Sequence, residues 1–481
     1  MGILLAQALL SARGFPGPDQ DEALYTHTGK LIWDGFLQGV PTTHWGAHGF
    51  FSGAPELYPV LAGRLDSAFG LTGVRTFSLL CMLATTGLLY LITRQLFGGR
   101  TALWTAAMYA VLPSVLELNV LATYDAPAVA LLALACWIAV RCGPSRAYVL
   151  AAPVAALAIA VKYAALMFLP AIAVLAALTA LRHRGRWHWP AAARALVLPA
   201  LVAAVLGAAM ALFGTAHLQG ARSTTTGRAQ SADSAEAVLR ISLQLGGWLF
   251  ALAGIGAVLY ALRDPSGTTP GRWWRVTYAS AMVLTAVLVP LYQAHLHTTV
   301  ALGKHLAYAL LFVAPLAGLA IDRFVGPYLP NLLCFLVAAG LVGLAVYGTN
   351  KATDLSRWFP DTSELARTLE PMVNAKGKYL AEPGNPMKYY FSETTAPDQW
   401  TELTWIDYTD PQGRKRQGFD AYRSAIRNGH FDLAVLDDHP GHDMSQRLIP
   451  ELEKSGKYRL ERTVANEDNS GPGEFQVWVR E

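Results

Sequence analysis

The sequence predicts a polytopic α-helical membrane protein with about 10–11 spans, followed by a C-terminal extracytoplasmic α/β domain. Of the 481 residues, 53% are hydrophobic and 15% are charged, whereas a soluble domain carries about 25% charged residues. Residues 1–350 hold 21 basic and 12 acidic side chains, whereas residues 351–481 hold 17 basic and 22 acidic side chains. We therefore expect a basic membrane domain (1–350) and a mildly acidic soluble domain (351–481), which excludes a soluble enzyme. The net charge of +4 is too small to indicate nucleic-acid binding.

Ten apolar segments are candidate membrane helices, because a helix that crosses the hydrocarbon core needs roughly 20 apolar residues. They are residues 71–97, 101–116, 126–140, 146–160, 164–181, 195–214, 241–262, 276–292, 306–321 and 328–348. Several are shorter than a full span, so we expect broken or tilted helices among them. Residues 1–12 are apolar but too short to cross, and they lack the basic start of a signal peptide. We interpret them as the end of a first span that begins outside this chain, or as a misplaced start.

Arginine gathers in alternate loops between these segments. The arginines concerned are Arg94, Arg100, Arg141, Arg146, Arg182, Arg184, Arg186, Arg194, Arg263, Arg272, Arg275 and Arg323. Basic loops stay on the cytoplasmic side of a membrane. The opposite face is then expected to hold residues 14–70, 117–125, 217–240 and 294–305 together with the C-terminal domain. This pattern predicts a multi-pass protein of the plasma membrane whose C-terminal domain is extracytoplasmic.

The outward segment 14–70 is expected to contain two amphipathic helices. Asp21 and Glu22 stand at the start of the first helix, and apolar residues recur at helical spacing over 24–36. A second short helix is expected over 55–65. Helices of this kind beside a membrane span lie on the bilayer surface.

Residues 351–481 predict a small α/β domain. The expected strands are 378–381, 431–436, 458–465 and 475–479, the expected helices are 362–373, 419–428 and 443–455, and a turn is expected at 469–473. No cysteine lies in this domain, so no disulfide holds it together. Asp437, Asp438, His439 and His442 form the nearest approach to a metal site, and we interpret them as a surface cluster after a strand.

Ionisable residues at the edge of a bilayer are candidate functional residues, because burying a charge there costs free energy. Asp125 precedes an apolar helix, and Lys162 interrupts an apolar stretch at an expected outward turn. The alternative for each candidate is a structural role as a helix cap, a snorkelling lysine or a hydrogen-bonded histidine. The outward candidates are Asp21, Glu22, Glu56, Glu117, Asp125, Lys162, His295, His297, Lys304 and His305.

These residue types suit sugar transfer from a lipid-linked phosphate. A carboxylate can accept the proton of an acceptor hydroxyl. Cations at the membrane surface can stabilise the departing phosphate as its charge grows. A donor with a polyprenyl chain must be bound at the bilayer, which accounts for amphipathic helices beside the acidic residues.

Four short motifs resemble those of glycosyltransferases with the GT-C fold that use polyprenyl-phosphate sugars. This superfamily includes bacterial aminoarabinose transferases and protein O-mannosyltransferases. The motifs are Asp21-Glu22-Ala23-Leu24-Tyr25 in the first outward loop, Asp125-Ala126-Pro127 at the start of a span, the Lys162-Tyr163 turn, and the proline-containing stretch Gly53-Ala54-Pro55-Glu56-Leu57-Tyr58-Pro59. The resemblance covers residues 19–348 and implies a GT-C-like membrane domain.

The resemblance also implies roles for individual residues. Asp21 corresponds to a base or acceptor-positioning acid, Asp125 to a second essential acid, and Lys162 to a contact of the donor phosphate. The candidate catalytic residues are accordingly Asp21, Glu22 and Asp125, and the candidate substrate-binding residues are Tyr25, Glu56, Lys162, Tyr163, Lys304 and His305. No cofactor is certain, and a divalent cation stays open because some relatives use one.

The leading hypothesis is a membrane glycosyltransferase that moves a sugar from a polyprenyl phosphate to an extracytoplasmic lipid, protein or polysaccharide, with inversion at the anomeric carbon. A multi-pass transporter or lipid flippase is the main alternative. Transporters tend to show internal repeats and a site near the midplane, whereas here no repeat is found and the acids lie at the outward edge. A third hypothesis makes the soluble domain a binding module with a membrane anchor, but ten-odd spans exceed what an anchor needs.

Overall fold

The computed structural model describes residues 1–12, 17–142, 145–184, 188–228, 230–262, 271–326, 332–439, 442–469 and 471–481. The chain divides into two compact units. The membrane unit comprises Met1–Arg13, Ile32–Leu61 and Leu65–Leu355, and the C-terminal unit comprises Gly14–Leu31, Ala62–Arg64 and Ser356–Glu481. The sequence-based boundary at residue 350 stays a prediction. Each unit is described by itself.

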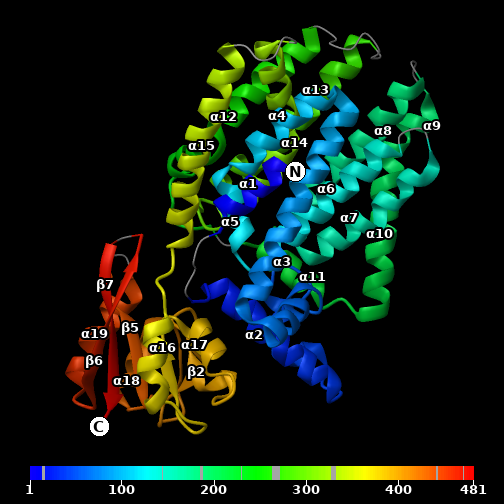
Figure 1. Cartoon of the computed structure of the whole chain (residues 1–481). Coiled ribbons are helices and arrows are strands. Elements are labelled where there is room, and N and C mark those ends of the chain that lie inside the picture. Colours follow the sequence, from blue (N-terminus) through cyan, green and yellow to red (C-terminus); the bar gives the residue numbers. More distant parts are fainter. Residues whose placement is uncertain are drawn as a thin grey trace. The chain divides into compact units, whose positions relative to one another are not determined.

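The membrane unit is built of helices whose long members run in roughly one direction (Figure 1). Short 3₁₀ helices at Thr42–Trp45, Ala47–Gly49, Arg146–Leu150 and Tyr163–Phe168 (η1–η4) interrupt or join them. The α-helices are α1 (Gly2–Leu10), the end of α2 (Gln20–Leu37), α3 (Tyr58–Phe97), α4 (Gly99–Ala110), α5 (Pro113–Val120), α6 (Asp125–Arg141), α7 (Ala151–Val161), α8 (Leu169–Arg184), α9 (Trp189–Ala192), α10 (Arg194–Phe213), α11 (His217–Thr224), α12 (Ala235–Leu262), α13 (Arg272–His295), α14 (Leu302–Val325) and α15 (Leu332–Ser356).

Seven helices of the described residues are long and apolar enough to cross a membrane, or eight if the bent pair α4–α5 counts as one span. The predicted multi-pass membrane protein is confirmed, but the number of long helices falls short of the expected 10–11. The difference lies in three predicted segments: α4 and α5 meet at 65°, α6 has 17 residues, and α7 has 11. At 1.5 Å per residue α6 is about 26 Å long, shorter than the hydrocarbon core. Arg186, Arg263 and residues 328–331 of the last predicted segment lie outside the described residues.

A helix is present at each position where the sequence predicts an amphipathic helix. Helix α2 begins at Gln20, and the helix expected over 55–65 begins at Tyr58. The latter continues into the first long span, and only Gly70 interrupts it, with a φ of 66° that leaves the helical region. A glycine adopts this conformation without the steric cost that a side chain would add, so the chain changes direction between the segment before Gly70 and the long segment after it.

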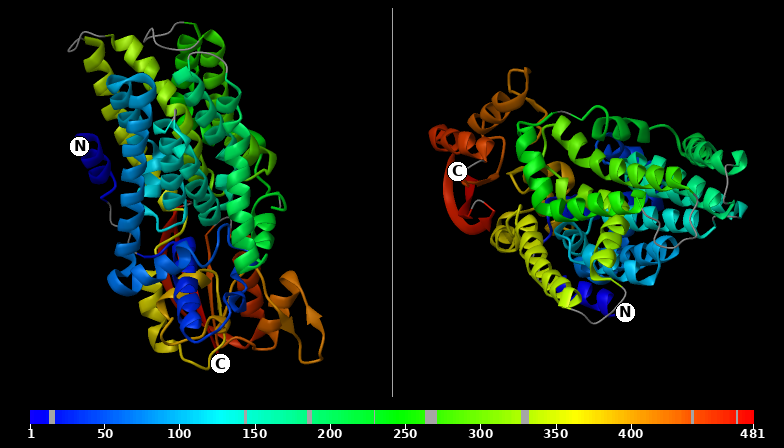
Figure 2. Two further views of the ribbon diagram at one scale, coloured as in Figure 1. Left: turned by 90° about the vertical axis from the view of Figure 1, so that its right-hand side faces the viewer. Right: turned by 90° about the horizontal axis from the view of Figure 1, so that it is seen from above.

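Helix α14 forms the core of the membrane unit. In the most apolar 18-residue stretch of α14, 78% of the residues are buried. The helix packs against α12, α4 and α13. At one end Arg100 of α4 forms an ion pair with Asp322 of α14 at 2.9 Å. By contrast, α15 lies at the edge of the helices in Figure 1 and in the view from above in Figure 2. Only 6% of its most apolar 18-residue stretch is buried. An exposed apolar face of this kind is the surface that a bilayer covers.

The C-terminal unit contains a five-stranded sheet in the order β2-β1-β5-β7-β6. Strands β2, β1 and β5 are parallel, and β7 is antiparallel to both β5 and β6. The strands are β1 (Tyr379–Ala381), β2 (Trp400–Thr401), β5 (Leu433–Asp437), β6 (Tyr458–Asp468) and β7 (Gly471–Arg480), and a separate ribbon pairs β3 (Tyr408–Thr409) with β4 (Lys415–Arg416). The helices are α16 (Ser363–Leu369), the 3₁₀ turns η5 (Glu370–Met372) and η6 (Pro397–Gln399), α17 (Gly384–Tyr390), α18 (Gly418–Arg427) and α19 (Asp443–Ser455), with the first part of α2.

Two hydrophobic cores flank this sheet. Tyr379 and Ala381 of β1 belong to the core that α16 and α17 cover, whereas Leu380 belongs to the core under α18 and α19 (Figure 1). This alternation follows from the two-residue period of a strand.

All four predicted strands and all three predicted helices of this domain are present. The expected turn 469–473 is wrong in part, because Gly471–Gly473 already pair with β6, and Ser470 lies outside the described residues. The sequence did not indicate α17 or the short strands β2, β3 and β4.

The close contact of α12 with α14 leads to a testable prediction. A Cβ atom on Gly256 would lie 1.9 Å from the carbonyl oxygen of Leu316, whereas one on Gly254 would have no neighbour within 4 Å. Gly256→Ala should therefore lower the free energy of unfolding by about 1–3 kcal/mol through overpacking. Gly254→Ala, on the same helix, should be neutral or slightly stabilising. Thermal unfolding of both variants in detergent checks this, and equal melting temperatures would contradict the close packing.

Candidate active site

Asp125 and Lys162 form a buried ion pair in the membrane unit. Asp125 is the first residue of α6, and Lys162 stands between α7 and η4. Lys162 Nζ lies 3.3 Å from Asp125 Oδ1, and the two side chains are 8% and 2% exposed. An acidic residue is favoured at a helix N-terminus by the helix dipole. The two residues that the sequence proposed separately are thus brought together.

Two tyrosines fix this pair. The hydroxyl of Tyr308, on α14, donates a hydrogen bond to Asp125 Oδ1 at 3.1 Å. The ring of Tyr124 lies under the Lys162 ammonium, 4.7 Å from Nζ to the ring centroid. A cation over an aromatic face is stabilised by the ring quadrupole. The carboxylate and the ammonium are therefore both oriented by partners besides each other.

Further polar and charged side chains lie near the pair. Lys304 and His305, at the start of α14, both interact electrostatically with Asp125, so the predicted residues of the late outward loop do reach this site. His305 Nδ1 is hydrogen-bonded to the amide of Gln293 at 2.7 Å, and Arg228 interacts electrostatically with His305.

Four residues of this site, Tyr124, Tyr308, Gln293 and Arg228, were missed by sequence reasoning. Tyr308 follows His305 by three positions on one helix, a spacing that places both on the same face. Gln293 and Arg228 carry no comparable local signal.

The turn that carries Lys162 is held by the first outward loop. The backbone N–H of Tyr163 donates to Ser52 O at 2.8 Å, and that of Ala54 donates to Ala160 O at 2.7 Å. Between them Gly53 approaches so closely that a Cβ would lie 1.9 Å from Val161 O. The loop and the turn therefore form one backbone-bonded element. Tyr163 is buried, and its substrate-binding role stays a prediction.

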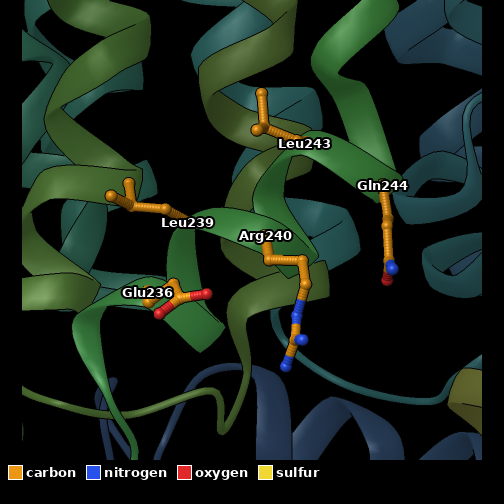
Figure 3. A pocket seen from close by; sticks show the side chains of 5 residues that line it. All are labelled: Glu236, Leu239, Arg240, Leu243 and Gln244. Atoms are coloured by element: carbon orange, nitrogen blue, oxygen red, sulfur yellow. The ribbon is translucent and has the colours of Figure 1, made fainter.

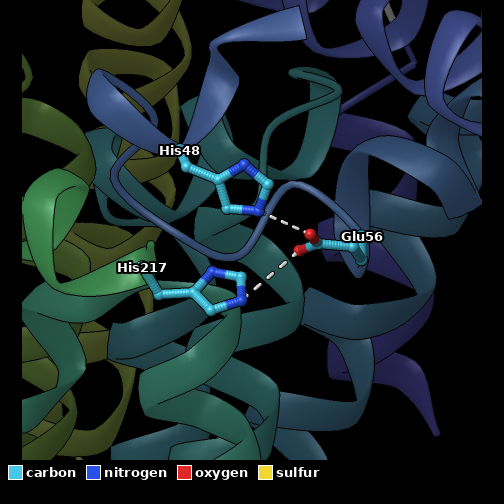
Figure 4. Close-up of side chains that lie close together, drawn as sticks. All are labelled: His48, Glu56 and His217. Carbon is cyan, nitrogen blue, oxygen red and sulfur yellow. Dashed lines mark hydrogen bonds and ion pairs between the residues drawn. The ribbon is translucent and has the colours of Figure 1, made fainter. Parts of the chain in front are cut away.

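Glu56 lies in a cluster with two histidines (Figure 4). His48 Nε2 is 2.5 Å from Glu56 Oε1, and His217 Nε2 is 3.9 Å from Glu56 Oε2. Figure 4 shows both rings directed toward the carboxylate, and the ligand atoms of the three residues lie within 4.8 Å of one another. Burial lowers the pKa of His217, partly opposed by the charge of Glu56, which favours the neutral imidazole that binds metal ions.

This arrangement gives Glu56 neighbours that the sequence did not predict. His48 comes from η2 and His217 from the start of α11, far apart in the chain. Histidines 295 and 297, which the sequence proposed, are absent from the group. The set of one carboxylate and two imidazoles is a ligand set that Zn²⁺ accepts.

Asp21, Glu22 and Tyr25 lie on the part of α2 that belongs to the C-terminal unit. The backbone N–H of Asp19 donates to Glu22 Oε2 at 2.9 Å, and that of Asp21 donates to Asp19 Oδ1 at 2.9 Å. The Asp19 and Glu22 side chains together thus cap the helix and satisfy N–H groups at its start. Glu22 is therefore buried as part of the cap, whereas Asp21 is only partly buried; their catalytic roles stay predictions.

An open hollow of about 720 Å³ lies along the first turns of α12. Figure 3 shows its lining side chains on one helix: Glu236, Leu239, Arg240, Leu243 and Gln244. Leucines beside charged groups are typical of a helix segment at the membrane boundary. Of the described predicted site residues, none lines this hollow, so it is distinct from the Asp125 site.

Residues 65–217 match the family described as dolichyl-phosphate-mannose-protein mannosyltransferase. This stretch contains both Asp125 and Lys162. Among curated proteins, no sequence matches the chain.

Solved structures of GT-C membrane enzymes are similar to the chain along nearly its whole length. Apo ArnT from Cupriavidus metallidurans is 15% identical, with a TM-score of 0.60, over 99% of this chain and 97% of ArnT. ArnT bound to undecaprenyl phosphate is 15% identical, with a TM-score of 0.58, over 99% and 96%. The oligosaccharyltransferase AglB from Archaeoglobus fulgidus, in complex with an inhibitory peptide and a dolichol-phosphate, is 12% identical, with a TM-score of 0.51, over 98% of this chain and 74% of AglB. The predicted GT-C fold is confirmed.

The burial of the Asp125–Lys162 pair predicts strong coupling between its members. Lys162→Met leaves a buried carboxylate without its partner and should cost about 3–5 kcal/mol of unfolding free energy, whereas Lys162→Met combined with Asp125→Asn should recover part of that loss. The exposed pair Lys351–Asp354, at 3.1 Å, is the matched control, and Lys351→Met should cost at most about 1 kcal/mol. Denaturant unfolding in detergent measures these three variants and Asp125→Asn alone. Additive effects of the single changes at 125 and 162 would show that the pair is not coupled.

Proposed function

We propose that the chain is a membrane glycosyltransferase that transfers a sugar from a polyprenyl-phosphate donor to an extracytoplasmic acceptor. The observation that carries the proposal is the buried Asp125–Lys162 pair, set among the cations Lys304 and Arg228 on a GT-C fold. Cations held at the end of apolar helices suit a phosphate whose lipid chain stays in the bilayer. The undecaprenyl phosphate bound by ArnT and the dolichol-phosphate bound by AglB are ligands of this class.

The proposed reaction is a single inverting displacement. The acceptor oxygen forms a bond to the anomeric carbon while the bond from that carbon to the phosphate oxygen breaks, and polyprenyl phosphate leaves. A carboxylate accepts the proton of the acceptor, a role we assign to Asp21, with Glu22 as the alternative. Lys162 stabilises the growing charge on the phosphate, and Asp125 holds the Lys162 ammonium in place.

The remaining predicted residues are proposed to bind substrates. Lys304 supplies positive charge beside Lys162, His305 offers an imidazole for hydrogen bonding, and Tyr163 and Tyr25 provide hydroxyl and ring surfaces for the sugar or the acceptor. The acceptor, whether lipid, protein or polysaccharide, is placed on the extracytoplasmic side of the plasma membrane together with the C-terminal domain. The arginine-rich loops on the other side support this orientation.

Donor turnover in proteoliposomes tests the function. The chain should release polyprenyl phosphate from at least one member of a panel of polyprenyl-phosphate sugars, and Asp21→Asn and Asp125→Asn should each reduce the rate by about 10²–10⁴-fold. Asp34→Asn, on the exposed face of the same helix α2, is the control for Asp21 and should keep the rate. Unchanged release from Asp21→Asn would move the base to Glu22 or Asp125. No release with any donor would favour the transporter hypothesis instead.

We also propose that His48, Glu56 and His217 hold a divalent cation that fixes the first outward loop to α11. Glu56 then acts through this ion rather than by contacting the sugar. Chelation should reduce donor turnover severalfold and added Zn²⁺ should restore it, because a bound metal orders its ligands. His217→Gln should lower the rate and abolish the response to chelation, whereas His188→Gln, outside the cluster, should retain it. Turnover that chelation leaves unchanged in the unaltered chain would contradict this role.

A further inference from the structure

The C-terminal unit gathers carboxylates at one edge of its sheet. Strands β1 and β5 are parallel, with Ala381 paired to Val435, so their carboxyl ends meet at the same edge. Glu382 follows β1, and Asp437 is the last residue of β5. In open α/β sheets, ligands bind at the carboxyl ends of parallel strands.

A histidine completes this group. His442 precedes α19, and its Nδ1 lies 2.7 Å from Glu382 Oε1 and 4.0 Å from Asp437 Oδ2. The ligand atoms of Glu382, Asp437 and His442 all lie within 4.8 Å of one another. We propose that these three residues bind a divalent transition-metal ion of the Zn²⁺ class, at a site that shares no residue with the proposed glycosyl-transfer site.

Hydrogen bonds from neighbouring groups hold the two carboxylates in position. Glu382 Oε2 accepts the backbone N–H of Asp437 at 2.9 Å and also the hydroxyl of Ser445. Asp437 Oδ1 accepts the backbone N–H of His439 at 3.1 Å and lies 2.7 Å from its ring Nδ1. The other oxygens, Glu382 Oε1 and Asp437 Oδ2, lie on the side of His442. Outer partners that orient ligands in this way are typical of metal centres.

A buried amide provides a second, independent observation. Asn466, at the end of β6, is 9% exposed and donates from Nδ2 to Asp437 Oδ2 at 3.2 Å. Its other polar atom, Oδ1, is buried and finds no hydrogen-bond partner among the described residues. A buried carbonyl oxygen without a partner costs free energy, and an ion or its bound water beside Asp437 would satisfy it.

The charges and ligand types favour a transition metal over Ca²⁺ or Mg²⁺. Asp468 adds a third carboxylate, with Oδ2 3.5 Å from His442 Nε2 and Oδ1 3.5 Å from His439 Nε2. Hard cations prefer ligand shells of oxygen alone, whereas an imidazole with carboxylates suits Zn²⁺ and its neighbours. The ion would join the end of β1, the end of β5 and the start of α19.

Metal content of the full chain in detergent tests the proposal. The purified protein is stripped with a chelator, dialysed against Zn²⁺ or Mg²⁺, and its bound metal is counted by mass spectrometry. His442→Gln and the isosteric Glu382→Gln should each bind one Zn²⁺ fewer than the unaltered chain, and Mg²⁺ should not bind. His430→Gln and Glu453→Gln, in the same unit but outside the cluster, should bind as much Zn²⁺ as the unaltered chain.

The His48–Glu56–His217 cluster requires its own control. His217→Gln should lower the Zn²⁺ count independently, so that the loss in His442→Gln persists in the double variant. Co²⁺ in place of Zn²⁺ gives visible absorption bands that change on loss of a nitrogen ligand, which reports on His442 directly. Equal Zn²⁺ content and equal Co²⁺ spectra in the unaltered chain, His442→Gln and Glu382→Gln would overturn the proposal and leave a network of ion pairs.

Discussion

An ammonium and a carboxylate remain buried in an apolar helical unit when each compensates the charge of the other. Either ion alone would lose several kcal/mol of hydration free energy in this environment. Asp125 and Lys162 meet that constraint at 3.3 Å, and Tyr308 and Tyr124 occupy further directions around them. As a result, the start of α6, the turn after α7 and the first turns of α14 are tied to one point. The cations Lys304 and Arg228 then surround a centre whose geometry is already fixed.

The irregular backbone of the membrane unit lies where these polar groups are needed. Lys162 has an extended conformation between two helical segments, and α4 and α5 meet at a bend of 65°. Backbone groups freed by such breaks must find partners, because no water is present in the hydrocarbon core. The bonds between residues 52–54 and 160–163 provide them at the Lys162 turn. Short helices are thus a consequence of placing a charged turn among apolar segments.

The sequence was informative wherever the signal is local. Apolar runs identified the helices of the membrane unit, and short runs of strand-forming residues bounded by turn signals identified β5, β6 and β7. It indicated that some segments are broken but not where, because composition reveals that a segment is apolar and not where its helix ends. Strands β2, β3 and β4 have two residues each, too few for a period to be seen. Asp125 and Lys162 were found because a charge inside an apolar run is conspicuous, whereas Tyr308 and Gln293 act only through contacts between distant segments.

The two candidate cation clusters show why ligand sets escape motif searches. In each, a glutamate from a segment between regular elements meets a histidine near the start of a distant helix, His217 for α11 and His442 for α19. A zinc finger has ligands at short, fixed spacings that a sequence motif can describe. No such motif describes either cluster here, because the ligands come together only when the chain folds. The clusters share no residue and belong to different units. Metal bound by the unaltered chain could therefore occupy either cluster. It is evidence for one cluster when the ligands of the other cluster have been substituted.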